Sequence, residues 1–204
     1  KCCGRPMISK GLLDQAGKNA RHNVELLLPY VQQGVKIVGC EASCISAITD
    51  DWPDLLDGEK QSKEIADAVI TIEELLVETF GDGDQQIQWT DVAKKVQFFG
   101  HCHQRTLTGT SKTMVALNFP PNYQATEISA GCCGMAGSFG YEKNHIDIAS
   151  AAGEDRLFPA VRDSDPNVEI ATSGVSCREQ IGFNTQHHSR HVVEVLAEAL
   201  TLND

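Results

Sequence analysis

The sequence lacks the features that mark nucleic-acid-binding and membrane-spanning proteins. Its 17 lysines and arginines are outnumbered by 28 aspartates and glutamates, so the net charge is −11 at pH 7. Because no basic stripe is present to neutralise phosphates, nucleic acid is not an expected partner. No apolar run resembles a transmembrane helix, and no segment resembles a signal peptide. We therefore expect a cytoplasmic protein, with a peripheral position at the inner face of the membrane as the alternative.

A dinucleotide-binding motif is also missing. The glycines at 131, 134, 137 and 140 do not form a G-x-G-x-x-G, so we expect no flavin or nicotinamide on this chain. Hydrophobic residues make up 41% of the sequence and charged residues 22%, which is ordinary for a globular protein. A length of 204 residues suits one large domain or two small ones.

Cysteine, in contrast, is abundant and clustered. Without a secretory signal, clustered cysteines are better read as metal or cluster ligands than as disulfides. The alternative, thiols scattered through a core, does not explain the clustering. The eight cysteines are Cys2, Cys3, Cys40, Cys44, Cys102, Cys132, Cys133 and Cys177.

Apolar patterning alternates between strands and helices along the whole chain. This alternation predicts an α/β fold with two pseudo-repeated lobes, each a small, mostly parallel sheet flanked by helices. Loops are expected at 50–58 and at 81–84. Strands are expected at 35–38, 96–99, 125–129 and 168–171, and helices from Ser9 to about Pro29 and at about 62–80, 111–117, 145–161 and 192–200.

Two segments of the chain repeat each other. Residues 35–44 and 168–177 both read as a Val-charged-Ile strand that ends in Ser-Cys, and each follows a Cys-Cys-Gly. We therefore divide the chain into a first repeat at 1–95 and a second at 96–204. The strand before Cys102 has no counterpart ahead of Cys2, so we expect the first repeat to lack its first strand and helix. An exposed sheet edge invites pairing, so self-association through residues 1–40 is expected.

The cysteines of the second repeat are the main site candidates. Cys102, Cys132, Cys133 and Cys177 each follow a predicted strand, and the carboxyl ends of parallel strands meet at one edge of a sheet. Four thiolates suit an iron–sulfur cluster or a tetrahedral zinc ion. Contiguous cysteines with long intervals differ from zinc-ribbon knuckles and favour the cluster. In the first repeat, Cys2, Cys3, Cys40 and Cys44 would form an incomplete site.

Histidines and arginines near these cysteines have two interpretations each. His101 and His103 could bind a metal, but hydrogen bonding at a strand end is the preferred interpretation. His187, His188 and His191 could bind zinc, but the start of a solvated helix is favoured. Arg105 and Arg178 would either lower cysteine pKa values or lie on the surface.

The motifs resemble those of a known family. Residues 131–142 read GCCGMAGSFGYE, and they join a second Cys-Cys-Gly, a His-Cys-His at 101–103 and a Gly-Val-Ser-Cys-Arg at 174–178. This set resembles the CCG cysteine-rich domain of the heterodisulfide reductase B subunit and the glycolate oxidase iron–sulfur subunit. With the closing HVVEVLAEAL, it is most similar to the C-terminal region of large FAD-linked oxidases.

The resemblance implies a function for the domain. It would be an iron–sulfur electron-transfer domain of an FAD-linked 2-hydroxyacid dehydrogenase, and would relay electrons to a quinone or another acceptor. FAD would lie on another domain, and flavin and ferredoxin-like domains would be its partners. The rivals are a zinc-binding or metal-free docking domain and, ranked last because vicinal disulfides are strained, a thiol–disulfide enzyme that uses Cys132 and Cys133.

The sequence departs from the family pattern, in which each repeat closes with Cys-x-x-Cys. In the second repeat, Gly174 occupies the position of the first cysteine of this closing motif. In the first repeat, Glu41 occupies the same position. We therefore expect four thiolates in the second repeat rather than five.

Overall fold

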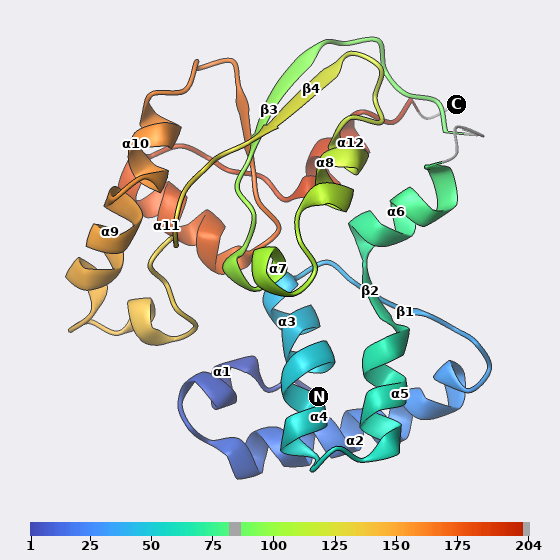
Figure 1. The fold of residues 1–204 in the computed structure, drawn as a ribbon. Coiled ribbons are helices and arrows are strands. Elements are labelled where there is room, and N and C mark those ends of the chain that lie inside the picture. The colour runs from blue at the N-terminus through green and yellow to red at the C-terminus, as the bar shows by residue number, and fades with distance from the viewer. Residues whose placement is uncertain (82–86, 202–204) are drawn as a thin grey trace.

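The computed structural model describes residues 1–81 and 87–201. Two small parallel sheets, each flanked by helices, form two lobes and confirm the predicted α/β class (Figure 1). The first sheet pairs β1 (Ile37–Gly39) with β2 (Val69–Thr71). In the second, β3 (Lys94–Phe98) lies between β4 (Tyr123–Glu127) and β5 (Glu169–Ala171). Most of the turn predicted at 81–84 lies outside the described residues.

Helices cover both sheets. The first lobe contains α1 (Arg5–Ser9), α2 (Leu13–Val31), α3 (Ala42–Ser46), a π-helical turn (Ala47–Asp51), α4 (Trp52–Leu55), α5 (Lys60–Ala68) and α6 (Ile72–Phe80). The second contains α7 (Cys102–Leu107), α8 (Ser111–Leu117), a 3₁₀ turn (Phe139–Tyr141), α9 (Ile146–Glu154), α10 (Leu157–Arg162), α11 (Val175–Thr185) and α12 (Val192–Glu198). Among the described helices, none is long and apolar enough to cross a membrane.

The helix predicted at 62–80 is two helices with a strand between them. Residues Val69–Thr71 are all β-branched, which favours strand, and they pair in parallel with Ile37–Gly39. Thr71 then caps α6: its hydroxyl accepts the amide of Glu74 at 3.1 Å, while the Glu74 carboxylate accepts the Thr71 amide at 2.9 Å. The helical spacing of apolar residues in this stretch therefore led to a wrong prediction, because the strand forms through its pairing with β1.

Two predictions in the first lobe were also wrong. Ser9 ends α1 instead of capping α2, and its hydroxyl accepts the amide of Ser138 at 2.9 Å. The loop predicted at 50–58 contains α4, where Trp52 is 1% exposed and its indole N–H donates to the carbonyl of Cys3 at 2.7 Å. Ser9 and Trp52 both form hydrogen bonds with segments far away in the sequence, and the local sequence pattern does not predict such contacts.

The helix predicted at 145–161 breaks between α9 and α10. Proline has no amide to donate, so Pro159 cannot continue the hydrogen-bond ladder to Asp155. After the break, the ring of Phe158 packs over Gly153, where an added Cβ would lie 2.2 Å from the ring.

Three apolar clusters form the core. One contains Phe99, Phe158 and Ile181, and it encloses Cys133 and Cys177. A second surrounds Phe98, and Leu76 and Val77 of α6 pack against it, so α6 contributes to the second lobe as well as the first (Figure 1). The third cluster, around Trp52 and Ile65, holds the first lobe together. The second sheet therefore brings buried cysteines into its own core.

The two Cys-Cys-Gly segments have the same backbone conformation. Gly4 and Gly134 both have positive φ, +95° and +92°. Each glycine packs against a helix further along the chain. An added Cβ at Gly4 would lie 3.3 Å from Cβ of Ala16 in α2, and one at Gly134 would lie 1.8 Å from the carbonyl oxygen of Ala149 in α9. The glycine in both motifs thus provides a left-handed turn and close contact with a helix.

The similarity continues to the end of each lobe, in a segment that sequence analysis missed. Thr71 pairs with Gly39 and caps α6, while Arg190 pairs with Ala171 and the next residue caps α12. Both caps are capping boxes closed by a glutamate three residues later. The segments 69–80 and 189–200 therefore occupy corresponding places in the two lobes.

Replacing Gly134 by alanine should strongly destabilise the protein. The substitution combines a left-handed φ with a collision against the backbone of α9, so we expect a loss of at least about 2 kcal/mol. Denaturant unfolding checks this. Gly131→Ala is the matched control, because its added Cβ would meet nothing within 4 Å. Equal stability of the two variants would contradict the packing described for Gly134.

Candidate functional site

Four cysteines meet at the carboxyl edge of the second sheet. Cys102 begins α7 after β3, Cys132 and Cys133 follow β4, and Cys177 is the third residue of α11 after β5. Their thiols lie close enough to affect one another's pKa in series, Cys102 with Cys132, Cys132 with Cys133, and Cys133 with Cys177. We call these residues the four-thiol group. The structure thus brings together all four cysteines singled out in the second repeat.

Hydrogen bonding gives the sulfurs different acidities. Bonds from the Cys102 and Cys133 thiols, together with the Gly134 amide, lower the pKa of Cys132. The same bonds raise the pKa of Cys102 and Cys133, and burial raises both further. Within these pairs, the contacts therefore lower the pKa of Cys132 and raise those of Cys102 and Cys133.

Two arginines hold the main chain around the group. Arg105 donates from its guanidinium to the carbonyls of Ala130 and Gly131, immediately before Cys132, and its charge also lowers the pKa of Cys132. Arg178 donates to the carbonyl of Thr172 at 3.0 Å, at the end of β5. Arg105 thus has the electrostatic role considered from the sequence, and Arg178 is a backbone clamp.

A smaller sulfur pair lies in the first lobe. The sulfurs of Cys3 and Cys44 are 3.3 Å apart, and Cys44 is the third residue of α3 just as Cys177 is the third of α11. The hydrogen bond between them lowers the pKa of Cys3 to about 6 and raises that of Cys44. Cys2 is exposed but hydrogen-bonds to Cys3, whereas Cys40 is exposed and bonds to no other thiol in the described chain.

Cysteine chemistry fits a metal or cluster, but the sulfurs do not surround one point. Within residues 1–81 and 87–201, no group of three or more Cys, His, Asp or Glu side chains is arranged to hold a metal ion. The four-thiol group instead forms a chain of hydrogen-bonded pairs. Its donor set is that of an iron–sulfur or zinc site, and the thiols would have to turn toward a common centre to bind one.

The histidines beside Cys102 face different ways. His101 is buried, its Nδ1 accepts the His103 amide at 3.3 Å, and burial lowers its pKa to about 4. His103 points to the first lobe, where Nδ1 lies 2.7 Å from the Ser46 hydroxyl and Nε2 lies 3.3 Å from the Arg5 guanidinium. Both nitrogens of His103 therefore contact the first lobe, and His101 is the histidine packed near the thiols.

Of the three later histidines, only His191 lies where a helix starts; His187 and His188 follow the end of α11. His191 caps α12, with Nδ1 accepting the Val193 amide at 3.0 Å, and its Nε2 lies 2.8 Å from the Cys40 carbonyl. His187 and His188 line an open hollow of about 610 Å³ beside Phe183. No three-histidine metal site is formed in the part of the chain that the structure describes.

The Glu41 carboxylate joins α3 and α11, the helices that carry Cys44 and Cys177. Sequence analysis did not predict this contact. Glu41 accepts the Ser43 hydroxyl at 2.8 Å on one oxygen and the Val175 amide at 3.0 Å on the other. It therefore satisfies donors at the start of both α3 and α11. The sequence held little signal for this contact, because glutamate is not among the preferred N-cap residues and Val175 lies 134 residues further along the chain.

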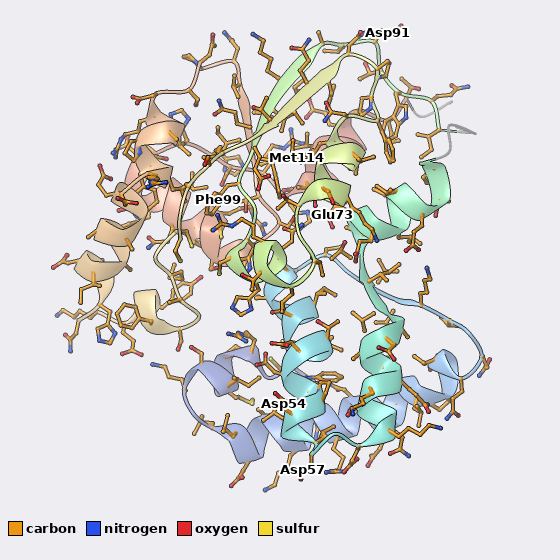
Figure 2. All side chains as sticks on the ribbon, viewed as in Figure 1. Asp54, Asp57, Glu73, Asp91, Phe99 and Met114 are labelled. Carbon is orange, nitrogen blue, oxygen red and sulfur yellow. The ribbon has the colours of Figure 1, made fainter. Side chains whose placement is uncertain are left out.

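A second buried carboxylate joins the lobes. Glu73, at the start of α6, is 1% exposed and accepts the Ser173 hydroxyl at 2.7 Å, just beyond β5 (Figure 2). Because a buried carboxylate needs a partner, this bond fixes the end of β5 against α6.

Comparison with known proteins relates the chain to parts of dehydrogenases. No family model matches it. It is 28% identical over 98% of its length to the C subunit of anaerobic glycerol-3-phosphate dehydrogenase from Escherichia coli K12, and it covers 50% of that protein. It is 27% identical over 97% of its length to D-2-hydroxyglutarate dehydrogenase of Haemophilus influenzae and 26% identical to that of Escherichia coli K12, covering 19% of each. The chain therefore spans about half, or about a fifth, of these relatives.

Removing the Glu41 carboxylate should weaken the contact between lobes. Glu41→Ala leaves the start of α11 without its acceptor, so we expect a loss of about 1 kcal/mol, typical of a lost helix cap. Glu41→Gln keeps an acceptor oxygen and serves as the control, with a smaller loss. Urea unfolding of both variants measures the difference. An alanine variant as stable as the wild type would show that the bridge contributes nothing.

Proposed function

We propose that this chain is an iron–sulfur electron-transfer domain of an FAD-linked oxidoreductase. The observation that carries the proposal is the four-thiol group, built from three parallel strands at one sheet edge. Similarity to a glycerol-3-phosphate dehydrogenase subunit and to D-2-hydroxyglutarate dehydrogenases supports the oxidoreductase context.

Cys102, Cys132, Cys133 and Cys177 would hold the cluster, which supplies one-electron transfer when bound. Around it, the residues of this chain exclude water and stabilise negative sulfur. Cys133 and Cys177 are buried in an apolar cluster, and the Gly134 amide donates to the Cys132 sulfur at 3.2 Å. Cys2, Cys3, Cys40 and Cys44 are the lesser candidates. Cys40 directly follows β1, and Cys44 has the same place in α3 that Cys177 has in α11.

The domain would act within a larger assembly. FAD would lie on another domain, where it oxidises a 2-hydroxyacid or a related alcohol, and a ferredoxin-like domain would pass electrons on. This chain would relay them to a quinone or another acceptor. A cytoplasmic location, or a peripheral one at the inner membrane face, belongs to the same proposal.

We also propose that the chain consists of two repeats. The boundary predicted between residues 95 and 96 falls inside β3, which starts at Lys94 and belongs to the second sheet, so the division lies just before this strand. The shared glycine turns, helix-borne cysteines and capping boxes support this division. Packing crosses the boundary, because α6 of the first repeat lies against α8 of the second.

A zinc-binding or metal-free docking domain is the second candidate. Its metal-free form is favoured by one observation, that no group of side chains among the described residues is arranged to hold a metal. Such a domain would hold the flavin module in place and move no electrons.

Anaerobically purified protein should contain iron and acid-labile sulfide, with broad visible absorbance that bleaches on reduction. Serine at position 102, 132, 133 or 177 should remove most of the iron, because each change removes one thiolate. Metal analysis and absorbance spectroscopy of each variant measure this.

Cys40→Ser is the matched control, since this thiol bonds to no other in the described chain, and it should retain full iron content. Zinc at one atom per chain, without sulfide, would favour the docking domain. So would metal-free protein that still binds the flavin module.

Self-association through residues 1–40 remains a proposal. Leu12 and Leu13 are 52% and 50% exposed at the start of α2, and Leu26 and Tyr30 are exposed further along the same helix. Light scattering should show a mass that rises with protein concentration, and Leu26→Glu should reduce it by placing charge on the apolar surface. A constant monomer mass for the unmodified chain would rule the contact out.

A further inference from the structure

Position 174 points at the four-thiol group, although it carries no side chain. A Cβ built on Gly174 would lie 3.4 Å from Sγ of Cys177 and 2.4 Å from Cδ2 of His101. The backbone at Gly174 has φ −90°, which any residue can adopt. The reason for glycine here is therefore the imidazole of His101, which fills the space that a side chain would need.

Hydrogen bonding fixes which nitrogen of His101 carries the proton. Nδ1 accepts the His103 amide at 3.3 Å. A neutral imidazole has one donor and one acceptor nitrogen, so the proton lies on Nε2. His101 is 5% exposed, and its Nε2 makes no hydrogen bond to another described residue. Its ring, with Cδ2 beside position 174, therefore lies next to Cys177 with an N–H that no protein group uses.

We propose that His101 takes the place of a fifth cysteine and donates its Nε2–H to a sulfur of the four-thiol group once that group holds an iron–sulfur cluster. The inference rests on the function proposed above. In this arrangement His101 is not a ligand, since its proton occupies the nitrogen that would bind iron. It acts through the sulfur, as a positioning residue.

The corresponding place in the first lobe lacks such a donor. Glu41, at the position equivalent to Gly174, offers only acceptor oxygens and uses them on Ser43 and Val175. Hydrogen bonds to cluster sulfurs stabilise the more negative, reduced state and raise the reduction potential. The effect is therefore confined to the second lobe.

Redox titration of the anaerobically purified protein tests the proposal. His101→Ala should lower the reduction potential while iron and sulfide per chain stay at the wild-type level. His101→Gln, whose amide can also donate, should restore part of the difference. His188→Ala, which removes an exposed histidine elsewhere, is the control and should leave the potential unchanged.

Gly174→Ala provides an independent test. Its methyl group collides with the imidazole and should displace it, so this variant should lower the potential as well. Combining it with His101→Ala removes the collision, so the double variant should be more stable than Gly174→Ala alone. The two single effects on the potential should not add, because both remove the same donor.

Three results would overturn the proposal. An unchanged potential in His101→Ala with full iron content would show that no such bond forms. A strong ¹⁴N coupling in the magnetic resonance spectrum of the reduced protein, lost in His101→Ala, would show that His101 is a ligand. Protein that contains no iron would overturn the cluster itself, and so would separate failure of the proposed function from failure of this inference alone.

Discussion

Parallel pairing of β3 with both of its neighbours is the constraint on which the site depends. It aligns the carboxyl ends of β3, β4 and β5, and the chain leaves each strand directly toward a cysteine of the four-thiol group. The vicinal pair adds a second requirement. Adjacent side chains diverge in an extended chain, so Cys132 and Cys133 both reach neighbouring thiols only where the backbone turns. Gly134 makes that turn, and close contact with α9 holds it.

Contacts between the lobes are fixed by a few buried or capping polar groups. Glu41 reaches the start of α11, and Glu73 reaches Ser173 beyond β5. His103 turns both ring nitrogens to the first lobe. Each contact starts at, or ends on, a residue close to a site cysteine. The same residues that join the lobes therefore also lie beside the site.

Sequence was sufficient for the parts of the fold that local chemistry specifies. The α/β class and the helix at 111–117 follow from apolar periodicity, and the cysteines that meet at one edge follow from strand ends. The errors arose where a distant partner decides. Val69–Thr71 has helical spacing yet pairs with β1, and Trp52 lies in a polar stretch yet is buried by contact with Cys3. The orientation of the His101 ring could not be predicted from the sequence, because it depends on the space left by Gly174, 73 residues further along the chain.

The two lobes differ at the equivalent positions Glu41 and Gly174, each of which lies three residues before a helix-borne cysteine. In the second lobe, Gly174 leaves room for His101, and Ser173 binds Glu73 of the first lobe. In the first lobe, the corresponding Glu41 binds the second lobe through Val175, and the carbonyl of Cys40 meets His191. Residues at or next to these two positions therefore make contacts between the lobes. The Glu41 carboxylate already accepts donors of both α3 and α11, so it could bind a metal only by giving up these bonds.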